Sequence, residues 1–502
     1  MTEIDSTEGW EGVLARLDER RAASRAMGGE ERLLKHRAGG KLDARARVDH
    51  LLDPGSFLEL GTLVGGEESA ADAIVMGSGR IDGRPVMVAA EDFTVKAGTI
   101  SSFSNSKRHR VAELALRDRV PLVMMLEGAG FRADGRHGGG RSPVDLLAQA
   151  ACSGKVPLIT AVLGASAGHG ALVAPISDFA VMSAHASVFT AGPPVVRESL
   201  GEEITKEDLG GPSVAVASGL IHNVAPDDAA ALDLVRTYLR YFPSSAWSFP
   251  PHFAGGDDGP REVPELLDVI PRNGRRVYDV HGVVEAVFDE DSFFEVQPEF
   301  GRTVVTGLAR LGGTPVAVVA NQPLVQAGSI DADGADKGAH FITVADSFHL
   351  PIVFLSDNPG VMPGSASERA GILRSGARMF AAQTQATTPK FEITMRKAYG
   401  FGSMVMGMIA FDGQSGVFAF PGATMGAMGA AAMSKARQSD ADEAAMLRDM
   451  EVEASFRSAE SFGFDELIDP RETRNVLLHS VGRALYRRQA GAEPVARFGI
   501  SP

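Results

Sequence analysis

The sequence predicts an α/β protein built by tandem duplication of one domain. Two observations lead to this prediction. Segments of sequence recur in the same order about 230 positions apart, and within each copy short β-branched runs alternate with longer segments typical of helices. The chain of 502 residues is also longer than one ordinary hydrophobic core supports, so two domains are expected on length alone.

The repeat is visible in individual residues. Arg80–Val86 (RIDGRPV) resembles Arg310–Val316 (RLGGTPV), and the same displacement takes Glu127, at the end of one apolar run, to Asp357, at the end of another. Farther along, the displacement becomes 232 and relates Pro157 to its counterpart. A chance similarity would not keep its register over about 120 residues, so we interpret the chain as two copies of one domain.

Each copy is expected to contain buried strands joined by helices. Short apolar runs without an alternating polar period are typical of strands covered on both faces of a sheet. The predicted strands are Val86–Ala90, Leu122–Leu126 and Leu158–Leu163 in the first copy, and Val316–Ala320, Ile352–Leu355 and Phe391–Met395 in the second. Helices are predicted over Ser106–Arg117 and Lys337–Phe348, each beginning near a Ser or Asp.

Composition suggests where the domains begin and end. Residues 1–40 are charged and rich in Arg, Glu and Ala, which predicts a helical arm. The two copies are assigned to residues 41–242 and 271–502. The segment between them, 243–270, is predicted to be a linker because much of it is rich in Pro, Gly and acidic residues without a regular period. Residues 430–460 contain no Gly or Pro and predict one long helix.

Composition also excludes several classes of protein. Hydrophobic residues at 44% and charged residues at 23% are typical of a globular chain. The longest apolar stretch, Val156–Ile176, is interrupted by glycines and a histidine, so no spanning helix is expected. The N-terminus has no basic segment followed by an apolar core, so no secretory signal is expected. Cys152 is the one cysteine, which excludes an intrachain disulfide and a cysteine-based zinc ribbon. A cytoplasmic setting is expected, and the net charge of −15 argues against a nucleic-acid partner.

Two glycine-rich turns follow predicted strands at equivalent positions of the copies. They are Gly164–Gly170 (GASAGHG) and Tyr399–Ser403 (YGFGS). Such a turn from strand into helix leaves backbone N–H groups free, and two N–H groups aimed at one point form an oxyanion hole. The alternative is that the glycines only allow close packing of strand on helix. Because the turns recur at matched positions, we favour the oxyanion holes.

No residue pattern for an ordinary catalytic base accompanies these turns. The sequence has no nucleophile elbow, no HExxH motif and no Walker lysine, and no paired carboxylates follow the first turn. A duplicated fold with two oxyanion holes therefore suits a reaction whose base comes from a cofactor.

Over about residues 30–490 the chain resembles a known family, the β, or carboxyltransferase, subunits of acyl-CoA carboxylases such as propionyl-CoA and methylcrotonyl-CoA carboxylase. The motifs that carry the resemblance are Gly40–Arg47, Glu91–Val95, Gly164–Gly170, Asn321–Pro323, Pro359–Gly364 and Arg396–Gly400. The resemblance implies two crotonase-type (ββα-spiral) domains. It also implies a hexamer whose active sites lie between the N-domain of one protomer and the C-domain of another, with CoA mainly on the N-domain and biotin on the C-domain.

The resemblance also implies roles for particular residues. The catalytic donors would be Gly168 and His169 for the thioester and Gly400, Phe401 and Gly402 for biotin. Substrate-binding residues would be Lys107, Gly128, Ala129, Gly130, Arg132, Ala165 and Met404. Cofactor-binding residues would be Pro359, Gly360 and Tyr399. No metal is expected in this subunit.

The chain departs from the family pattern at three of these positions. His169 replaces the second glycine of a Gly-Gly pair; its side chain either narrows the acyl pocket or contacts substrate, or else turns outward. Phe401 replaces a small residue, and Met404 replaces an aspartate associated with acyl-chain choice, so these changes leave the acyl-CoA specificity open and the reaction class intact. Lys107 and Arg132 are either contacts to the CoA phosphates or a solvated surface pair.

The resemblance implies the carboxyltransferase subunit of an acyl-CoA carboxylase, which transfers carboxylate from carboxybiotin to the α-carbon of an acyl-CoA. The chain has no biotin-attachment tetrapeptide and no ATP-grasp region, so a separate biotin carboxylase/biotin carboxyl carrier α-subunit would be the partner. One alternative is a biotin-dependent decarboxylase or transcarboxylase subunit. Others are a non-catalytic structural subunit, and a hydratase or isomerase without biotin, which is disfavoured because Asp178 is the lone acidic residue between Val156 and Phe189.

Overall fold

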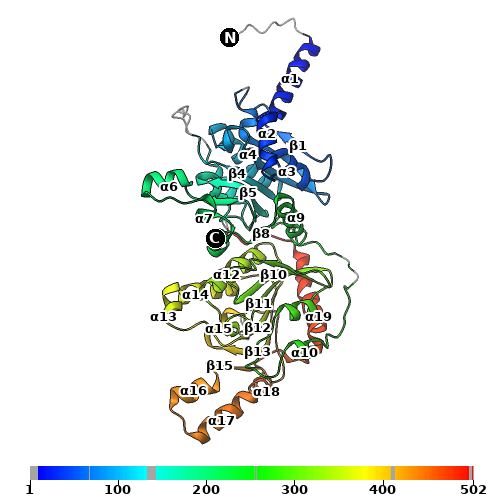
Figure 1. Cartoon of the computed structure of the whole chain (residues 1–502). Helices are drawn as coiled ribbons and strands as arrows, with labels where there is room; N and C mark the ends of the chain where they lie inside the picture. The colour runs from blue at the N-terminus through cyan, green and yellow to red at the C-terminus, as the bar shows by residue number, and fades with distance from the viewer. Residues whose placement is uncertain are drawn as a thin grey trace. The chain divides into compact units, whose positions relative to one another are not determined.

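The structure is a computed structural model that describes residues 9–66, 68–132, 143–253, 255, 257–408, 413–496 and 500 (Figure 1). It divides into two compact units, here called unit 1 (Met1–Thr237) and unit 2 (Tyr238–Ser501). The segment predicted as a linker follows this division and packs on unit 2. The backbone N–H of Phe253 donates to the carbonyl oxygen of Gly313 (2.9 Å), and Leu266 is fully buried.

Unit 1 contains an eight-stranded sheet in the order β1-β2-β3-β4-β5-β6-β8, with β7 paired to β5. Strands β3 to β6 are parallel, whereas β2 and β3 form an antiparallel pair. The strands are β1 (Leu58–Leu60), β2 (Ile74–Ile81), β3 (Arg84–Glu91), β4 (Leu122–Gly128), β5 (Leu158–Ala167), β6 (Phe179–Ser183), β7 (Ser187–Phe189) and β8 (Asn223–Ala225). The α-helices are α1 (Trp10–Arg25), α2 (Glu30–Ala38), α3 (Ala44–Leu51), α4 (Ser102–Asp118), α5 (Asp145–Cys152), α6 (Pro193–Leu200), α7 (Lys206–Gly210), α8 (Pro212–Ala217) and α9 (Asp228–Leu239). Short 3₁₀ helices, labelled η, are η1 (Ala70–Ala73), η2 (Lys96–Gly98) and η3 (Gly168–Val173).

Unit 2 repeats this sheet in the order β16-β14-β13-β12-β11-β10-β9, with β15 paired to β13. The strands are β9 (Phe294–Val296), β10 (Val304–Leu311), β11 (Thr314–Asn321), β12 (Ile352–Asn358), β13 (Lys390–Tyr399), β14 (Gly416–Ala419), β15 (Thr424–Gly426) and β16 (Glu466–Leu467). The helices are α10 (Leu266–Val269), α11 (His281–Val287), η4 (Gln326–Gly328), α12 (Ala332–Ser347), α13 (Ser365–Ala370), α14 (Ile372–Gln385), α15 (Gly400–Val405), α16 (Ala430–Arg437), α17 (Ala441–Val452), α18 (Ala454–Glu460), η5 (Pro470–Glu472), α19 (Thr473–Leu485) and η6 (Tyr486–Ala490).

The two sheets share one register, which confirms the duplication. All pairs between β2 and β3 recur in β10 and β11 at the displacement seen in the sequence. The parallel pairing that follows slips between Leu126 and Gly128 in unit 1, and between Ser356 and Asn358 in unit 2. Because a shift of one residue would move every side chain to the other face of a strand, a shared register means that equivalent residues occupy equivalent places.

All six predicted strands are confirmed, but both predicted helices begin earlier than expected. Helix α4 begins at Ser102 because Ser101 caps it, with the Ser101 hydroxyl accepting from the N–H of Ser104 and the Ser104 hydroxyl accepting in return. Helix α12 begins at Ala332 because the Asp331 carboxylate accepts from a backbone N–H of the first turn. The capping residues lie several positions before the apolar pattern on which the predictions relied.

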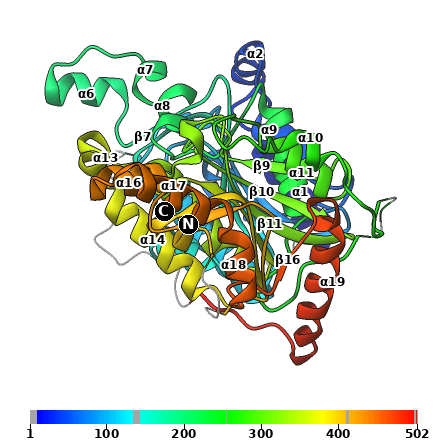
Figure 2. The ribbon, with the colours of Figure 1, turned by 90° about the horizontal axis from the view of Figure 1, so that it is seen from below.

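The single long helix predicted over residues 430–460 is wrong. Three helices, α16 to α18, occupy this segment, and α16 and α17 (orange) extend from the body of unit 2 (Figure 1). In the view turned by 90°, α16 and α17 lie in front of the rest of unit 2 (Figure 2). Gln438 ends α16 in the left-handed conformation (φ +54°), and Asp440 then caps α17 by accepting from the N–H of Glu443. A helix can therefore end here without Gly or Pro, because a capping aspartate starts the next one.

Each sheet has its own hydrophobic core. In unit 1, Val111 and Ala115 of α4 pack with Leu122 and Met124 of β4, and all four are at most 1% exposed. In unit 2, residues of α11 and α19 belong to one buried cluster with the strands β10 to β13. Of the helices that the structure describes, none is long and apolar enough to span a membrane.

Candidate active site

The first glycine turn joins strand β5 to helix η3. Gly168, the first residue of η3, has φ +57°, a conformation that a residue with a Cβ adopts only with strain. The preceding Ala167 offers no side-chain cap, so no side chain caps the first N–H groups of η3, which have no partner within the helix. Ala165 and His169 lie on either side, so the structure places these predicted residues together at the carboxyl end of β5.

The second glycine turn joins strand β13 to helix α15 in the same way. Gly400, the first residue of α15, has φ +55° and no side-chain cap at the residue before it. A Cβ on Gly400 would lie 3.1 Å from the carbonyl oxygen of Ala427, and one on Gly168 would lie 3.4 Å from that of Thr190. The two turns thus match in backbone conformation and in having a carbonyl oxygen against the glycine, as their positions in the repeat predict.

A second glycine loop lies against each turn. In unit 1 it is Gly128-Ala129-Gly130, and a Cβ on Gly130 would approach the carbonyl oxygen of Ala167 to 3.2 Å. The N–H of Ala129 donates to the carbonyl oxygen of Ala97 (3.0 Å), which fixes the loop against η2. The structure therefore brings the predicted residues of this loop next to the first turn.

In unit 2 the matching loop is Asn358-Pro359-Gly360, which follows β12. Gly402 lies directly against it, because a Cβ on Gly402 would come within 2.7 Å of the backbone of Gly360. A Cβ on Gly360 would lie 3.5 Å from the carbonyl oxygen of Tyr399, and Pro359 is exposed. These predicted cofactor-binding residues therefore form one group at the second turn.

Lys107 is buried, so it is not a member of a solvated surface pair. Its ammonium group donates to the carbonyl oxygens of Gly61, Ala71 and Ile74 at 3.3, 2.7 and 2.5 Å. Lys337, the equivalent residue of unit 2, binds two carbonyl oxygens at 2.8 and 2.9 Å. Burial lowers the pKa of Lys107 to about 8 and that of Lys337 to about 7. Each ammonium group therefore fastens its helix, α4 or α12, to the backbone of its own unit. This role leaves Lys107 outside the phosphate contacts that we propose below.

Arg132 lies in the segment that follows β4, at the edge of the described residues. Its guanidinium donates to Asp72 Oδ1 (2.6 Å) and to both the hydroxyl and the carbonyl oxygen of Thr99 (3.0 and 2.8 Å). The side chain is 13% exposed. The guanidinium is therefore held in place by unit 1 and presents only a small edge to solvent.

Three further residues of the second turn have distinct surroundings. Burial and a hydrogen bond from the Tyr399 hydroxyl to Glu451 raise the pKa of Tyr399 above its ordinary value. The ring of Phe401 lies 5.9 Å from that of Phe380, centroid to centroid. Met404 is 41% exposed, which leaves its side chain accessible to a ligand.

The side chain of His169 points to a buried carboxylate that the sequence does not place near the turn. Its Nε2 atom lies 2.6 Å from Asp145 Oδ1, while Asp145 Oδ2 accepts from Arg108 Nε at 2.7 Å. Arg108 Nη1 in turn donates to Glu91 Oε1 at 2.6 Å. The His169 side chain is 31% exposed and the other three are at most 2% exposed. We call these four residues the first-turn relay.

Three of the four side chains of the relay, Glu91, Arg108 and Asp145, are ionisable groups that lie buried. Burial opposes ionisation of Asp145, but the hydrogen bond from His169 and the adjacent Arg108 outweigh it and lower the pKa of Asp145 to about 2. Burial dominates at Glu91 and raises its pKa despite Arg108. The sequence motif of the turn does not predict that Glu91, Arg108 and Asp145 lie behind it. A signal was present in the repeat, because unit 2 has uncharged Asn321 and Gly338 at the positions of Glu91 and Arg108.

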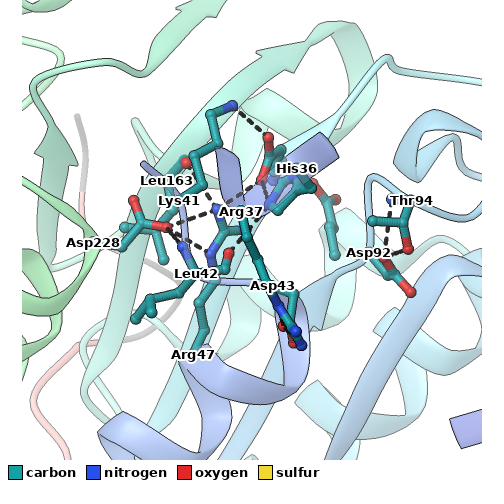
Figure 3. A network of polar contacts seen from close by, with 12 residues as sticks. His36, Arg37, Lys41, Leu42, Asp43, Arg47, Asp92, Thr94, Leu163 and Asp228 are labelled. Atoms are coloured by element: carbon teal, nitrogen blue, oxygen red, sulfur yellow. Dashed lines mark hydrogen bonds and ion pairs between the residues drawn. The ribbon is translucent and has the colours of Figure 1, made fainter. Parts of the chain in front are cut away.

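A second charged network joins α3 to the strands β4 and β5 and to α9 (Figure 3). Lys41 Nζ lies 2.7 Å from Glu127 Oε1, and Arg47 Nη2 lies 2.7 Å from Glu127 Oε2 and 2.8 Å from Asp228 Oδ2. These cations outweigh the effect of burial and lower the pKa of Glu127. A Cβ on Gly164 would lie 2.3 Å from Glu127 Cδ, so the first glycine of the GASAGHG turn makes room for this carboxylate.

The arrangement therefore offers two matched sets of backbone donors, one of them beside an ionisable side chain. Developing negative charge on a carbonyl or ureido oxygen is stabilised by such donors. Among the described residues, no group of three or more His, Cys, Asp or Glu side chains is placed to hold a metal ion.

Comparison with known proteins identifies the family. Residues 35–489 match the model of the carboxyl transferase domain, so the chain belongs to the carboxyl transferase domain family. It is 35% identical to a propionyl-CoA carboxylase carboxyltransferase subunit of Haloferax mediterranei (97% of this chain, 98% of the relative). It is also 35% identical to the methylmalonyl-CoA decarboxylase subunit alpha of Veillonella parvula (94% and 96%).

A solved structure supports the same assignment. The crystal structure of transcarboxylase 12S, a hexamer with methylmalonyl-coenzyme A and methylmalonic acid bound, superposes with a TM-score of 0.90 at 32% identity and covers 99% of this chain and 100% of its own. The fold class expected from the sequence is therefore confirmed. The chain is an enzyme of the carboxyltransferase class.

Proposed function

We propose that this chain is the carboxyltransferase subunit of a biotin-dependent acyl-CoA carboxylase. It would transfer a carboxyl group from carboxybiotin, carried on a separate subunit, to the α-carbon of an acyl-CoA. The observation that supports this most strongly is the pair of matched turns, each with a glycine at φ near +56°, an uncapped helix start and a second glycine loop against it. Two acceptor oxygens, one on each reactant, call for two such donor sets.

The residues of the first turn would act on the acyl-CoA. The N–H groups of Gly168 and His169 would donate to the thioester oxygen and stabilise the negative charge that develops there when the α-carbon loses its proton. The loop Gly128–Gly130, with Ala165, would form the wall beside the acyl group. Arg132 would contribute a positive edge for the CoA phosphates, since its guanidinium is held rigidly by Asp72 and Thr99.

The residues of the second turn would hold biotin. The uncapped N–H groups at Gly400, Phe401 and Gly402 suit the ureido oxygen that biotin presents, and the small residues of the turn allow its rings to approach. Pro359, Gly360 and Tyr399 would complete the wall of this pocket. Bound carboxybiotin supplies the carboxyl group and then the base.

Transfer assays test this proposal. The purified chain is combined with a biotin carboxylase/biotin carboxyl carrier α-subunit, MgATP, labelled bicarbonate and a series of acyl-CoAs of increasing chain length. Carboxylated product is measured by incorporated label or by mass spectrometry. We expect carboxylation of at least one acyl-CoA. In the same series Met404→Asp should change relative rates by ten- to a hundredfold, because a change of pocket contacts equivalent to one methylene is worth about 1–3 kcal/mol. Folded, oligomeric chain that transfers no carboxyl group in either direction would refute the proposal.

A second function has support from the comparisons. A decarboxylase and a transcarboxylase subunit are among the relatives, at 35% and 32% identity. The same donor sets would serve those reactions, because removing a carboxyl group from a malonyl-type thioester passes through the same enolate. Incubating methylmalonyl-CoA with the chain and biotin distinguishes the two directions. If the chain removes the carboxyl group from methylmalonyl-CoA faster than it forms methylmalonyl-CoA in the reverse reaction, the result indicates the decarboxylase.

We also propose that the chain assembles as a homo-hexamer, as the structurally similar transcarboxylase does. Mass photometry of the purified chain at micromolar concentration measures this directly. A species near the chain mass of 52.8 kDa as the main peak would contradict the assembly.

A further inference from the structure

The first-turn relay gives this chain an ionisable side chain at the place where the proposed function needs none. His169 occupies the first helical turn of η3, next to the glycine whose N–H is a proposed donor. At the equivalent position of unit 2 stands Phe401, whose ring packs against Phe380 and cannot exchange a proton. The histidine therefore adds an acid–base group to one of two otherwise matched turns.

The buried carboxylate fixes which nitrogen of His169 carries the proton. Asp145 Oδ1 lies 2.6 Å from Nε2 and accepts a hydrogen bond, so Nε2 holds the proton in the neutral ring and Nδ1 holds a lone pair. Asp145 is itself held as the anion by Arg108, 2.7 Å away. Nδ1 has no hydrogen-bond partner among the described residues, and the side chain is 31% exposed. The pair thus resembles the His–Asp arrangement of acid–base catalysts.

The rest of the relay holds this pair rigid. Arg108 also donates to Glu91 Oε1, while Glu91 Oε2 accepts from the backbone N–H of Glu127 at 2.8 Å. A Cβ on Gly170 would lie 3.3 Å from Glu91 Oε1, so the helix of the turn rests directly on this carboxylate. The imidazole is therefore positioned by groups on β3, α4 and α5 as well as by its own turn.

We propose that the His169 imidazole, oriented by Asp145, removes and returns an α-proton of the acyl-CoA bound at the first turn, so that the chain exchanges α-hydrogens with solvent without biotin. This inference rests on the proposed function, which places the thioester there. In the forward step the Cα–H bond breaks, the proton passes to Nδ1, and the electron pair moves into the thioester, whose oxygen accepts from the N–H groups of the turn. In the reverse step a solvent-derived proton returns from Nδ1 to the α-carbon.

The experiment measures deuterium in acyl-CoA after incubation with the purified full chain in D₂O, with no biotin or carrier present. Acetyl-, propionyl- and longer acyl-CoAs serve as probes, and mass spectrometry counts α-deuterons. We expect exchange by the wild-type chain and a fall of at least a hundredfold in His169→Gln, which keeps a side chain able to bind Asp145 but cannot act as a base. In His169→Gly, added imidazole should restore exchange, which a purely structural role would not explain.

Matched variants separate the base from the residue that positions it. Asp145→Asn should slow exchange by ten- to a hundredfold, because a neutral amide, which can also donate, replaces the carboxylate that fixes the tautomer of the ring and stabilises its protonated form. Gln149→Leu is the control. Gln149 Nε2 donates to the same carboxylate at 3.3 Å without touching the imidazole, so exchange should stay within about threefold of wild type. Thermal melting of each variant establishes that it is folded.

The outcomes distinguish this inference from the proposed function. Exchange at the wild-type rate in folded His169→Gln, or no exchange by a wild-type chain that transfers carboxyl groups with the carrier, overturns the inference and leaves the carboxyltransferase intact. A wild-type chain that exchanges but never transfers a carboxyl group refutes the proposed function while supporting the role of His169. A folded wild-type chain that does neither overturns both.

Discussion

The two glycine turns share a backbone but differ in what lies behind them. Behind the first turn, charged side chains fill the space between the helices and the sheet: Glu91, Arg108 and Asp145, joined to His169. Behind the second turn, uncharged Asn321 and Gly338 stand at the positions of Glu91 and Arg108. A Cβ on Gly376 would lie 3.0 Å from the Phe401 ring, and one on Gly338 would lie 2.7 Å from the methyl of Met379.

This difference shows which feature the duplication preserved. The glycines, their positive φ angles and the slipped register recur in both units. The side chains behind them differ, with a buried ion-pair network in unit 1 and uncharged Asn321 and Gly338 at the positions of Glu91 and Arg108 in unit 2. A backbone donor set depends on main-chain conformation, and either kind of packing supports it. The divergent layer is therefore free to differ in chemistry, and in unit 1 it brings an imidazole to the turn.

The largest expected effect concerns the stability of the charged layer. Arg108→Met should lower the free energy of unfolding of unit 1 by about 3–5 kcal/mol, because it leaves Glu91 and Asp145 buried without their cation. Urea denaturation, with hydrogen exchange of unit 1 amides as the local probe, measures it. Arg110→Met is the control: its side chain is 48% exposed and pairs with Glu113, so it should cost less than about 1 kcal/mol. Equal losses in the two variants would contradict the asymmetry between the layers.

The next effect concerns the glycine at positive φ that both turns share. Gly168→Ala and Gly400→Ala should each lower kcat for carboxyl transfer on the order of 10²–10³-fold, because a Cβ at positive φ displaces the donors of that turn. Gly201→Ala is the control, since Gly201 has φ +70° with open space around it and lies outside both turns. It should cost stability and leave kcat unchanged. If one of the two turn variants keeps full activity, the turns are not functionally equivalent.

A smaller effect is expected from acid. The pKa of Asp145 lies at about 2 in the folded chain against 3.8 for the ordinary group, so the folded state binds its proton less readily than the unfolded state. The resulting stability is present above about pH 4 and is lost as the pH falls toward 2, and amounts to about 2 kcal/mol. The difference in unfolding free energy between wild type and Asp145→Asn, followed across that range, isolates it. A difference that does not shrink as the pH falls would contradict the assigned pKa.

The smallest effect concerns the contact between the Phe401 and Phe380 rings in unit 2. Phe401→Leu removes the contact with Phe380, at 5.9 Å between ring centroids, and should cost about 1 kcal/mol of stability. Calorimetry of the two variants Phe401→Leu and Phe380→Leu, with the double variant, gives the coupling between the rings. Strictly additive losses would show that the pair contributes nothing beyond burial.

Much of this protein was accessible from the pattern of residues alone. The duplication, the six central strands and the two glycine turns could be predicted because they depend on local features: β-branched runs, a repeat that keeps its register, and glycines at matched positions. The repeat also fixed the equivalence of Gly168 with Gly400. The starts of α4 and α12 were predicted too late, since the caps Ser101 and Asp331 lie several positions before the apolar pattern begins.

The side chains that surround the turns could not be predicted from the sequence, for a physical reason. Asp145 meets His169 across 24 positions, and Glu91 meets Arg108 across 17, through the packing of α4 and α5 against the ends of the strands. Periodicity reports which face of an element is buried, but not which buried charges will share a site. The same limit applies to Lys107, which the sequence left as either a CoA-phosphate contact or a surface cation. Its ammonium instead binds three carbonyl oxygens inside unit 1. Local sequence therefore set the elements and the donor turns, while contacts between distant segments determined the charge placed beside them.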